Sequence, residues 1–208
     1  MSLHLIIGDK LLSSWSLRAA LALELTGAAY TEELIKLGKP DTRENLLKHS
    51  PTGKVPLLKT AHGTVADSLA IAEYLAEQFA GLWPTDIGAR AQARSACAQM
   101  HAGFFAMRNH MPFDLSRDAP LNPVPPEVKV DIERMLALWA ECRAAANEPG
   151  PFLFGRATLA DAFFAPIAVR LRTYQVQLPA VDEAYVETVY QWPAFKAWQK
   201  AGLEELQP

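Results

Sequence analysis

The chain has 208 residues, of which 50% are hydrophobic and 21% charged, a composition typical of a globular protein with a sizeable core. The formal net charge is −3 and the basic residues never form a run, so nothing favours a nucleic-acid-binding surface. No apolar stretch reaches the roughly 18 residues of a membrane span, and the N-terminus carries no basic leader, so we expect a cytoplasmic protein.

The first residues alternate between strand and helix patterns. The apolar run at 3–7 predicts a buried strand, an Ala/Leu-rich helix follows at 16–26 and ends at Gly27, and residues 30–35 predict a second strand. A strand, a crossover helix and a second strand form the unit that places parallel strands side by side.

The next elements complete a small α/β unit. A short helix is predicted at 41–48, two strands at 55–59 and 63–65, and a helix that begins at Asp67-Ser68 and continues to Phe79. The order β-α-β-α-β-β-α indicates a mixed sheet with helices on its faces.

The composition changes at the Gly-Leu-Trp-Pro stretch that begins at residue 81, and no convincing strand follows it. We therefore expect an α/β domain over 1–80, a linker over 81–87 and an all-helical domain over 88–208. Helical patterns lie at 88–110, 126–146, 158–173 and 193–201.

Two cysteines, Cys97 and Cys142, stand far apart in helical patterns without further metal ligands nearby. We expect no metal site and no disulfide framework, but two buried thiols in a reducing compartment. Cysteine is thus not the obvious nucleophile.

Val55-Pro56 stands at the head of the predicted third strand, straight after a loop that contains glycine. Base rates favour an ordinary trans proline at a sheet edge, and this setting makes the bond a candidate cis peptide. A cis bond would turn the backbone N–H and C=O of Val55 outward, where they can pair with an extended peptide-like ligand.

Asp67 and Ser68 have two open interpretations. Both residue types cap helices, because a side-chain oxygen accepts the free N–H groups of the first turn. The same N–H groups and the helix dipole suit a carboxylate, and Asp67 adds an acceptor for an ammonium group.

Farther along, Thr158 and Asp161 form a capping-box pattern, for which we expect a structural role.

Four patterns in this order resemble the cytosolic glutathione S-transferase family over nearly the whole chain. The stretch "SSWSLR" is most similar to the serine-type classes, zeta and tau, in which a serine stands five residues before an arginine that opens an apolar helix. The resemblance implies a thioredoxin-like N-terminal domain followed by an all-α C-terminal helical domain, a homodimer, glutathione as co-substrate and a role in detoxification. The four patterns are Ser13, Val55-Pro56, Asp67-Ser68 and the Thr158–Asp161 box.

The resemblance makes Ser13, five residues before Arg18, the catalytic residue. The thiol of free glutathione has a pKa above neutral, so the reactive thiolate is the minor form at pH 7. A hydroxyl that donates to the sulfur stabilises the thiolate by roughly 1.5–3 kcal/mol, which is about one to two pKa units. Ser13 then acts as a donor and does not attack. Ser14 and Ser16 compete for this role, and we expect one of them to cap the helix.

The resemblance also places glutathione along the N-terminal domain. Val55 pairs with the cysteinyl backbone, and Asp67 with Ser68 binds the γ-glutamyl end. Lys54 either reaches the glycyl carboxylate or is a solvated surface lysine.

The second substrate, a small electrophile, is expected between the domains. The stretch from His101 onward mixes aromatic and polar residues, and ordinary helix core accounts for part of it. Phe105 and Arg108, one turn apart, would suit an aromatic or anionic electrophile if their face looks into the cleft.

The chain departs from the zeta pattern at Trp15, where that class has a cysteine. This departure disfavours a dedicated maleylacetoacetate isomerase, but glutathione-dependent isomerisation stays an alternative. Cysteine-type classes are disfavoured because no cysteine lies within 11–16. A dehalogenase, a peroxidase and a non-catalytic binding or interaction protein with this fold also remain as alternatives. The Ser13 hydroxyl together with Val55-Pro56 and Asp67-Ser68 favours the enzyme.

Overall fold

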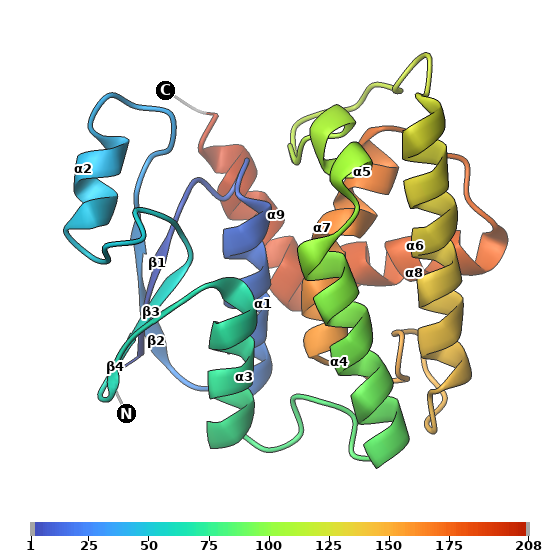
Figure 1. Cartoon of the computed structure of the whole chain (residues 1–208), viewed down its shortest axis with the longest axis horizontal. Coiled ribbons are helices and arrows are strands. Elements are labelled where there is room, and N and C mark those ends of the chain that lie inside the picture. Colours follow the sequence, from blue (N-terminus) through green and yellow to red (C-terminus); the bar gives the residue numbers. More distant parts are fainter. Residues whose placement is uncertain (1–2, 207–208) are drawn as a thin grey trace.

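The strands lie in the first part of the chain and form one mixed sheet (Figure 1). The computed structural model describes residues 3–206. The strand order is β2-β1-β3-β4, with β1 parallel to β2 and antiparallel to β3, and with β3 antiparallel to β4. This order confirms the prediction of a crossover unit followed by two antiparallel strands. The elements are β1 (Leu3–Ile7), α1 (Ser14–Thr26), β2 (Tyr30–Leu34), α2 (Thr42–Leu47), β3 (Leu57–Thr60), β4 (Gly63–Ala66) and α3 (Ser68–Gln78).

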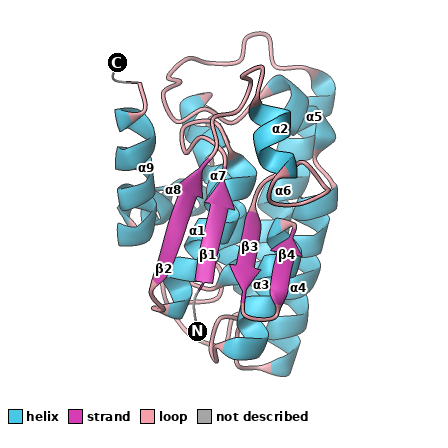
Figure 2. Cartoon of the chain, turned by 90° about the vertical axis from the view of Figure 1, so that its left-hand side faces the viewer, coloured by secondary structure: helices cyan, strands magenta, loops and turns pink. Residues whose placement is uncertain are grey.

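Helices cover both faces of the sheet (Figures 1 and 2). Helices α1 and α3 lie between the sheet and the later helices, and α2 lies against the other face. Side chains of β1 point alternately to the two faces. Leu3, Leu5 and Ile7 therefore join the large core, whereas Ile6 packs with Leu46 of α2 in a small second core. Burial on both faces explains why this strand is apolar apart from the half-buried His4.

The later part of the described chain is helical, which confirms the predicted fold class of a thioredoxin-like unit followed by an all-α unit. Helix α3 ends at Gln78 and α4 begins at Ile87, so residues 79–86 connect the two parts and the last residue of the predicted linker 81–87 belongs to α4. A division into domains at that segment stays a prediction. The later helices are α4 (Ile87–Ala102), α5 (Phe105–His110), α6 (Pro126–Ala144), α7 (Leu159–Thr173), α8 (Ala180–Gln191) and α9 (Pro193–Glu204).

The predicted single helix at 88–110 is wrong, because the chain breaks between α4 and α5. Gly103 has an extended backbone, and Phe104 has a left-handed one with φ of 60°. Arg108 bonds the carbonyl groups that the break leaves free: its Nε donates to Gly103 O at 2.9 Å, and its Nη2 donates to Met100 O. The break therefore places Arg108 and the segment after α5 beside the cavity described below.

Helix α8 was not predicted from the sequence. Its apolar residues include three valines, whose branched side chains lower helix propensity. The helix forms because Tyr185, Val186 and Val189 bury one stripe against the other helices. Acidic residues in its first turn, Asp182 and Glu183, were the local signal for a helix start.

The predicted capping box at the start of α7 is confirmed. Thr158 Oγ1 accepts from the N–H of Ala160 at 3.2 Å, and Asp161 Oδ2 accepts from the N–H of Thr158 at 2.8 Å. Asp161 is fully buried, and its Oδ1 also accepts from Tyr185 OH at 3.1 Å and from the N–H of Leu153 at 3.2 Å. Burial raises the pKa of this carboxyl to about 6.

Candidate functional site

A cavity of about 1000 Å³ lies between the strand-containing part and the later helices. The start of α1, the segment before β3 and the end of β4 line one side of it. Helix α5, the segment after it and α7 line the other side. The structure brings five of the predicted site residues to this cavity: Ser13, Lys54, Val55, Asp67 and Arg108.

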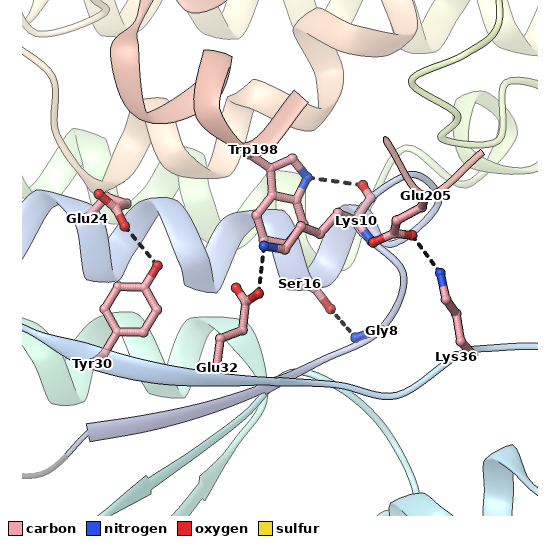
Figure 3. Close-up of polar contacts among 9 residues, drawn as sticks. All are labelled: Gly8, Lys10, Ser16, Glu24, Tyr30, Glu32, Lys36, Trp198 and Glu205. Carbon is pink, nitrogen blue, oxygen red and sulfur yellow. Dashed lines mark hydrogen bonds and ion pairs between the residues drawn. The ribbon is translucent and has the colours of Figure 1, made fainter. Parts of the chain in front are cut away.

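Ser13 is the N-cap of α1, so the capping predicted for Ser14 or Ser16 is wrong. Ser13 Oγ accepts from the N–H of Ser16 at 3.2 Å and donates to Ser16 Oγ at 2.8 Å. Ser16 Oγ accepts from the N–H of Gly8 at 3.0 Å, which joins α1 to the end of β1 (Figure 3). Ser14 also lines the cavity, whereas Ser16 is fully buried. Ser13 Oγ thus lies at a helix N-terminus that faces the cavity.

Arg18 places a buried positive charge one turn beyond Ser13. Its guanidinium stacks on the ring of Trp15, with 4.0 Å between Cζ and the ring centroid, and Nη1 lies 3.4 Å from His101 Nδ1. Burial lowers the pKa of Arg18 well below its usual value, and the charges of Arg108 and Arg170 lower it further. Arg108 and Arg170 line the cavity with Ser13, so together with the dipole of α1 they favour an anion in this cavity.

Val55 and Asp67 offer free polar groups to the cavity. The Val55-Pro56 peptide bond is cis, so of the two alternatives left open by the sequence the cis peptide is the one present. Within residues 3–206, neither the N–H nor the C=O of Val55 makes a hydrogen bond. Asp67 adopts a φ of 82° as N-cap of α3, and its Oδ1 accepts from the N–H groups of Leu69 at 2.7 Å and Ala70 at 3.3 Å. Its Oδ2 lies 3.4 Å from His101 Nε2, so Asp67 caps the helix and also presents an oxygen.

Three predicted residues are not in the lining of the cavity. Ser68 is fully buried at the first position of α3, and its Oγ has no hydrogen-bond partner in the described chain. His101 packs edge-on against Trp15 with 5.1 Å between centroids, behind Asp67, and burial lowers the pKa of His101. Phe105 is 67% exposed.

Two arginines face the predicted second-substrate region. Arg108 and Arg170 both line the cavity, and neither makes an ion pair within residues 3–206. Arg170 is 4% exposed, and its Nε donates to Met111 O at 2.9 Å while its Nη1 donates to Pro166 O at 3.1 Å. Burial, and then the charge of Arg108, lower the pKa of Arg170 to about 9. A carboxylate or similar anion would balance these charges.

Sequence reasoning missed Arg170, although a signal for it was present. It stands inside a helix whose other residues from 159 to 171 are uncharged apart from Asp161, and a lone charge in such a helix needs a buried partner or a polar cavity. The order of the helices along the chain does not show that this position faces the same space as Arg108.

The cysteines and the potential metal ligands of the described chain give little support to thiol or metal chemistry. Cys97 and Cys142 are both buried and free, and burial raises the pKa of the Cys142 thiol to about 12. Residues 3–206 contain no cluster of His, Cys, Asp or Glu side chains arranged to hold a metal ion. None of the helices described combines the length and apolar character needed to cross a bilayer.

Comparisons with known proteins bear on both parts of the chain. Residues 12–78 match the family model described as glutathione S-transferase, N-terminal domain, and residues 91–201 match the corresponding C-terminal domain. Glutathione S-transferase 1 of Dianthus caryophyllus is 31% identical, over 74% of this chain and 72% of that protein.

Solved structures share the whole fold. A glutathione transferase homologue from Burkholderia with bound glutathione superposes with a TM-score of 0.72 at 22% identity, over 98% of this chain and 99% of that one. A bacterial maleyl pyruvate isomerase, a zeta-class glutathione S-transferase, has a TM-score of 0.72 at 24% identity, over 97% and 98% of the two chains. At these identities the likeness shows the fold.

Proposed function

The chain belongs to the glutathione S-transferase family and is a glutathione transferase, and from this premise we propose that Ser13 activates the glutathione thiolate for reaction with a small anionic electrophile. One observation carries the proposal: the Ser13 hydroxyl caps α1 at the wall of the cavity that Val55 and Asp67 also line.

The contacts of Ser13 support a donor role. The N–H of Ser16 holds the Ser13 oxygen in place, so the hydroxyl proton can turn from Ser16 Oγ toward a sulfur in the cavity by rotation about a single bond. Ser16 Oγ keeps its hydrogen bond from Gly8 when this happens. The donor, the N-terminus of α1 and the nearby guanidinium groups all favour the negatively charged sulfur. The thiolate is the attacking group.

The free backbone groups of Val55 would pair with the cysteinyl backbone of glutathione by strand addition. Asp67 Oδ2 and the first turn of α3 would then hold the ammonium and carboxylate of the γ-glutamyl end. Lys54 also lines the cavity and would attract the glycyl carboxylate. The unpartnered Ser68 Oγ next to Asp67 is a further candidate donor for the γ-glutamyl carboxylate.

The second substrate is expected to carry a carboxylate. Arg108 and Arg170 have no ion-pair partner within the described residues, and both line the cavity that Ser13 also lines. A charge-assisted hydrogen bond to either guanidinium contributes roughly 1.5–3 kcal/mol. Phe113 and Trp15 supply the apolar walls of this region.

We expect Arg170→Gln to lower kcat/KM for a carboxylate-bearing electrophile by about tenfold, because one charged hydrogen bond is lost. A neutral electrophile of matched reactivity should lose less than about threefold. Arg172→Gln is the control: it removes a guanidinium from the same helix, but Arg172 pairs with Glu187 at 2.6 Å and is not in the lining of the cavity. Equal losses for the charged and neutral electrophiles would contradict an anionic substrate.

The arginine pair also favours glutathione-dependent isomerisation of an unsaturated carboxylic acid. The thiolate would add to the double bond, the carbon chain would rotate, and the thiolate would leave, so that glutathione is not consumed. Incubation with cis-unsaturated dicarboxylic keto acids tests this alternative. Isomer formation at constant glutathione supports it, and a stable thioether adduct supports the transferase.

Glutathione binding and assembly of the chain are also part of the proposal, and each can be measured. Calorimetry with glutathione should show one site per chain, and Asp67→Asn should weaken binding without abolishing the fold. We propose a homodimer, which light scattering would detect as twice the chain mass. Two free, buried cysteines support a location in the cytoplasm.

A further inference from the structure

The loop between β1 and α1 is held by the last helix of the chain. Figure 1 places α9 beside the N-terminal end of α1, and these helices are in contact. This loop leads directly into Ser13, which lies about 190 positions before the contacting residues of α9. The loop that leads into Ser13 and the C-terminal helix are therefore physically coupled.

Both backbone polar groups of Lys10 bind to the C-terminal segment (Figure 3). The indole Nε1 of Trp198 donates to Lys10 O at 3.0 Å, and the N–H of Lys10 donates to Glu205 Oε1 at 3.0 Å. Trp198 is 6% exposed, and the Lys10 ammonium lies 5.3 Å from the centroid of its ring. Lys10 also pairs with Glu32 of β2 at 2.6 Å.

Glu205 also contacts the same loop indirectly, through ion pairs of Lys36. Its Oε2 pairs with Lys36 at 3.2 Å, and Lys36 pairs with Asp9 Oδ1 at 3.2 Å. Asp9 Oδ2 accepts from the N–H of Leu37 at 2.7 Å. The backbone carbonyl of Asp9 accepts from the N–H of Ser13 at 2.8 Å, so the position of Asp9 controls the backbone of Ser13.

The helix also packs tightly on the loop. A Cβ atom built on Gly202 would lie 3.2 Å from Leu11 N and 3.2 Å from Lys10 C. Leu11 O accepts from the N–H of Leu115 at 3.2 Å. Glycine at 202 therefore permits α9 to approach the backbone of the loop closely.

We infer that α9, through Trp198 and its C-cap residue Glu205, is a positioning element for the thiolate-stabilising hydroxyl of Ser13. This inference rests on the proposed function of Ser13. Trp198 and Glu205 do not line the cavity and act through the backbone of Lys10 and Asp9. Because the strength of a hydrogen bond to a thiolate depends on its distance and angle, a small shift of the loop weakens thiolate stabilisation more than it weakens glutathione binding.

Trp198→Phe and Glu205→Leu test the inference. Trp198→Phe keeps a six-membered aromatic ring but removes the pyrrole ring with its N–H donor, and Glu205→Leu removes both carboxylate contacts. For each variant we expect the pKa of the bound glutathione thiol to rise by about 0.5–1 unit, and kcat at neutral pH to fall about 3- to 10-fold. KM for glutathione should change less than about twofold, and activity should recover at high pH, where the thiol ionises unaided.

Two further variants separate positioning from general stability. Glu205→Gln keeps an acceptor for the N–H of Lys10, so its effect should be smaller than that of Glu205→Leu. Glu204→Gln is the matched control on the neighbouring residue, since Glu204 is exposed and pairs with Lys200 at 3.9 Å on its own helix. Its thiol pKa and kcat should equal those of the wild type.

The same titration on Ser13→Ala distinguishes the two proposals. If Ser13→Ala raises the thiol pKa but Trp198→Phe and Glu205→Leu do not, α9 is a structural element only and the inference is overturned by itself. If Ser13→Ala also leaves the thiol pKa unchanged, the function proposed for Ser13 fails and the inference fails with it. A rise in all three variants with an unchanged Glu204→Gln supports both.

Discussion

Ser13→Ala is expected to lower kcat/KM with glutathione by about 10- to 100-fold near neutral pH, because the thiolate loses a charge-assisted hydrogen bond of roughly 1.5–3 kcal/mol. The variant also loses the N-cap of α1, which costs about 1 kcal/mol of stability and leaves the chain folded. Steady-state kinetics over a range of pH measures the effect. The loss should shrink as the pH rises above the pKa of the thiol.

Ser13→Thr and Ser14→Ala are the matched comparisons for this prediction. Threonine keeps both the hydroxyl and the cap, so Ser13→Thr should retain more activity than Ser13→Ala. Ser14 also lines the cavity and is the neighbouring candidate. A larger loss for Ser14→Ala than for Ser13→Ala would contradict our assignment and move the role to Ser14.

Asp161→Ala is expected to destabilise the fold by about 3–5 kcal/mol, since its removal leaves several buried donors without an acceptor. These donors are the N–H groups of Thr158 and Leu153 and the hydroxyl of Tyr185. Urea unfolding at a fixed protein concentration measures the loss. A loss below about 1 kcal/mol would show that the Thr158–Asp161 capping box contributes little to the free energy of unfolding.

Asp161 also predicts a dependence of stability on pH. Its pKa is about 6 in the folded chain and 3.8 when unfolded, because burial disfavours the charged form. Between these values the native state binds more protons, so this group's contribution to stability falls as pH rises from about 4 to 6, by about 3 kcal/mol. Asp161→Asn cannot titrate, and the difference in unfolding free energy between the wild type and this variant should follow that fall. A pH-independent difference would contradict the raised pKa.

Local patterns were sufficient to predict most of the fold. The strands, the helix that ends at Gly27 and the capping box at Thr158 each depend on short-range chemistry that the sequence displays directly. The break at Gly103 and helix α8 were missed because packing decides them: Arg108 bonds the freed carbonyls at the break, and burial of Tyr185 overrides weak helix propensity.

The candidate site was predictable in its N-terminal half. There, a serine, a Val-Pro pair and a helix cap stand in a recognisable order in the sequence. The half contributed by the later helices depends on which faces of α5 and α7 meet the cavity, and the sequence does not show these faces. Arg170 was therefore missed, and Phe105 was predicted for a cavity whose lining does not include it. The contact of α9 with Lys10 was equally hidden, since it joins the two ends of the chain.

The central claim is that the Ser13 hydroxyl stabilises the thiolate of bound glutathione. The most direct test is to titrate the thiolate absorbance of glutathione bound to the wild type and to Ser13→Ala. We expect the wild-type complex to show a thiol pKa about one to two units below that of free glutathione, and the variant to lose most of that difference. Equal thiol pKa values in the two complexes would contradict the claim.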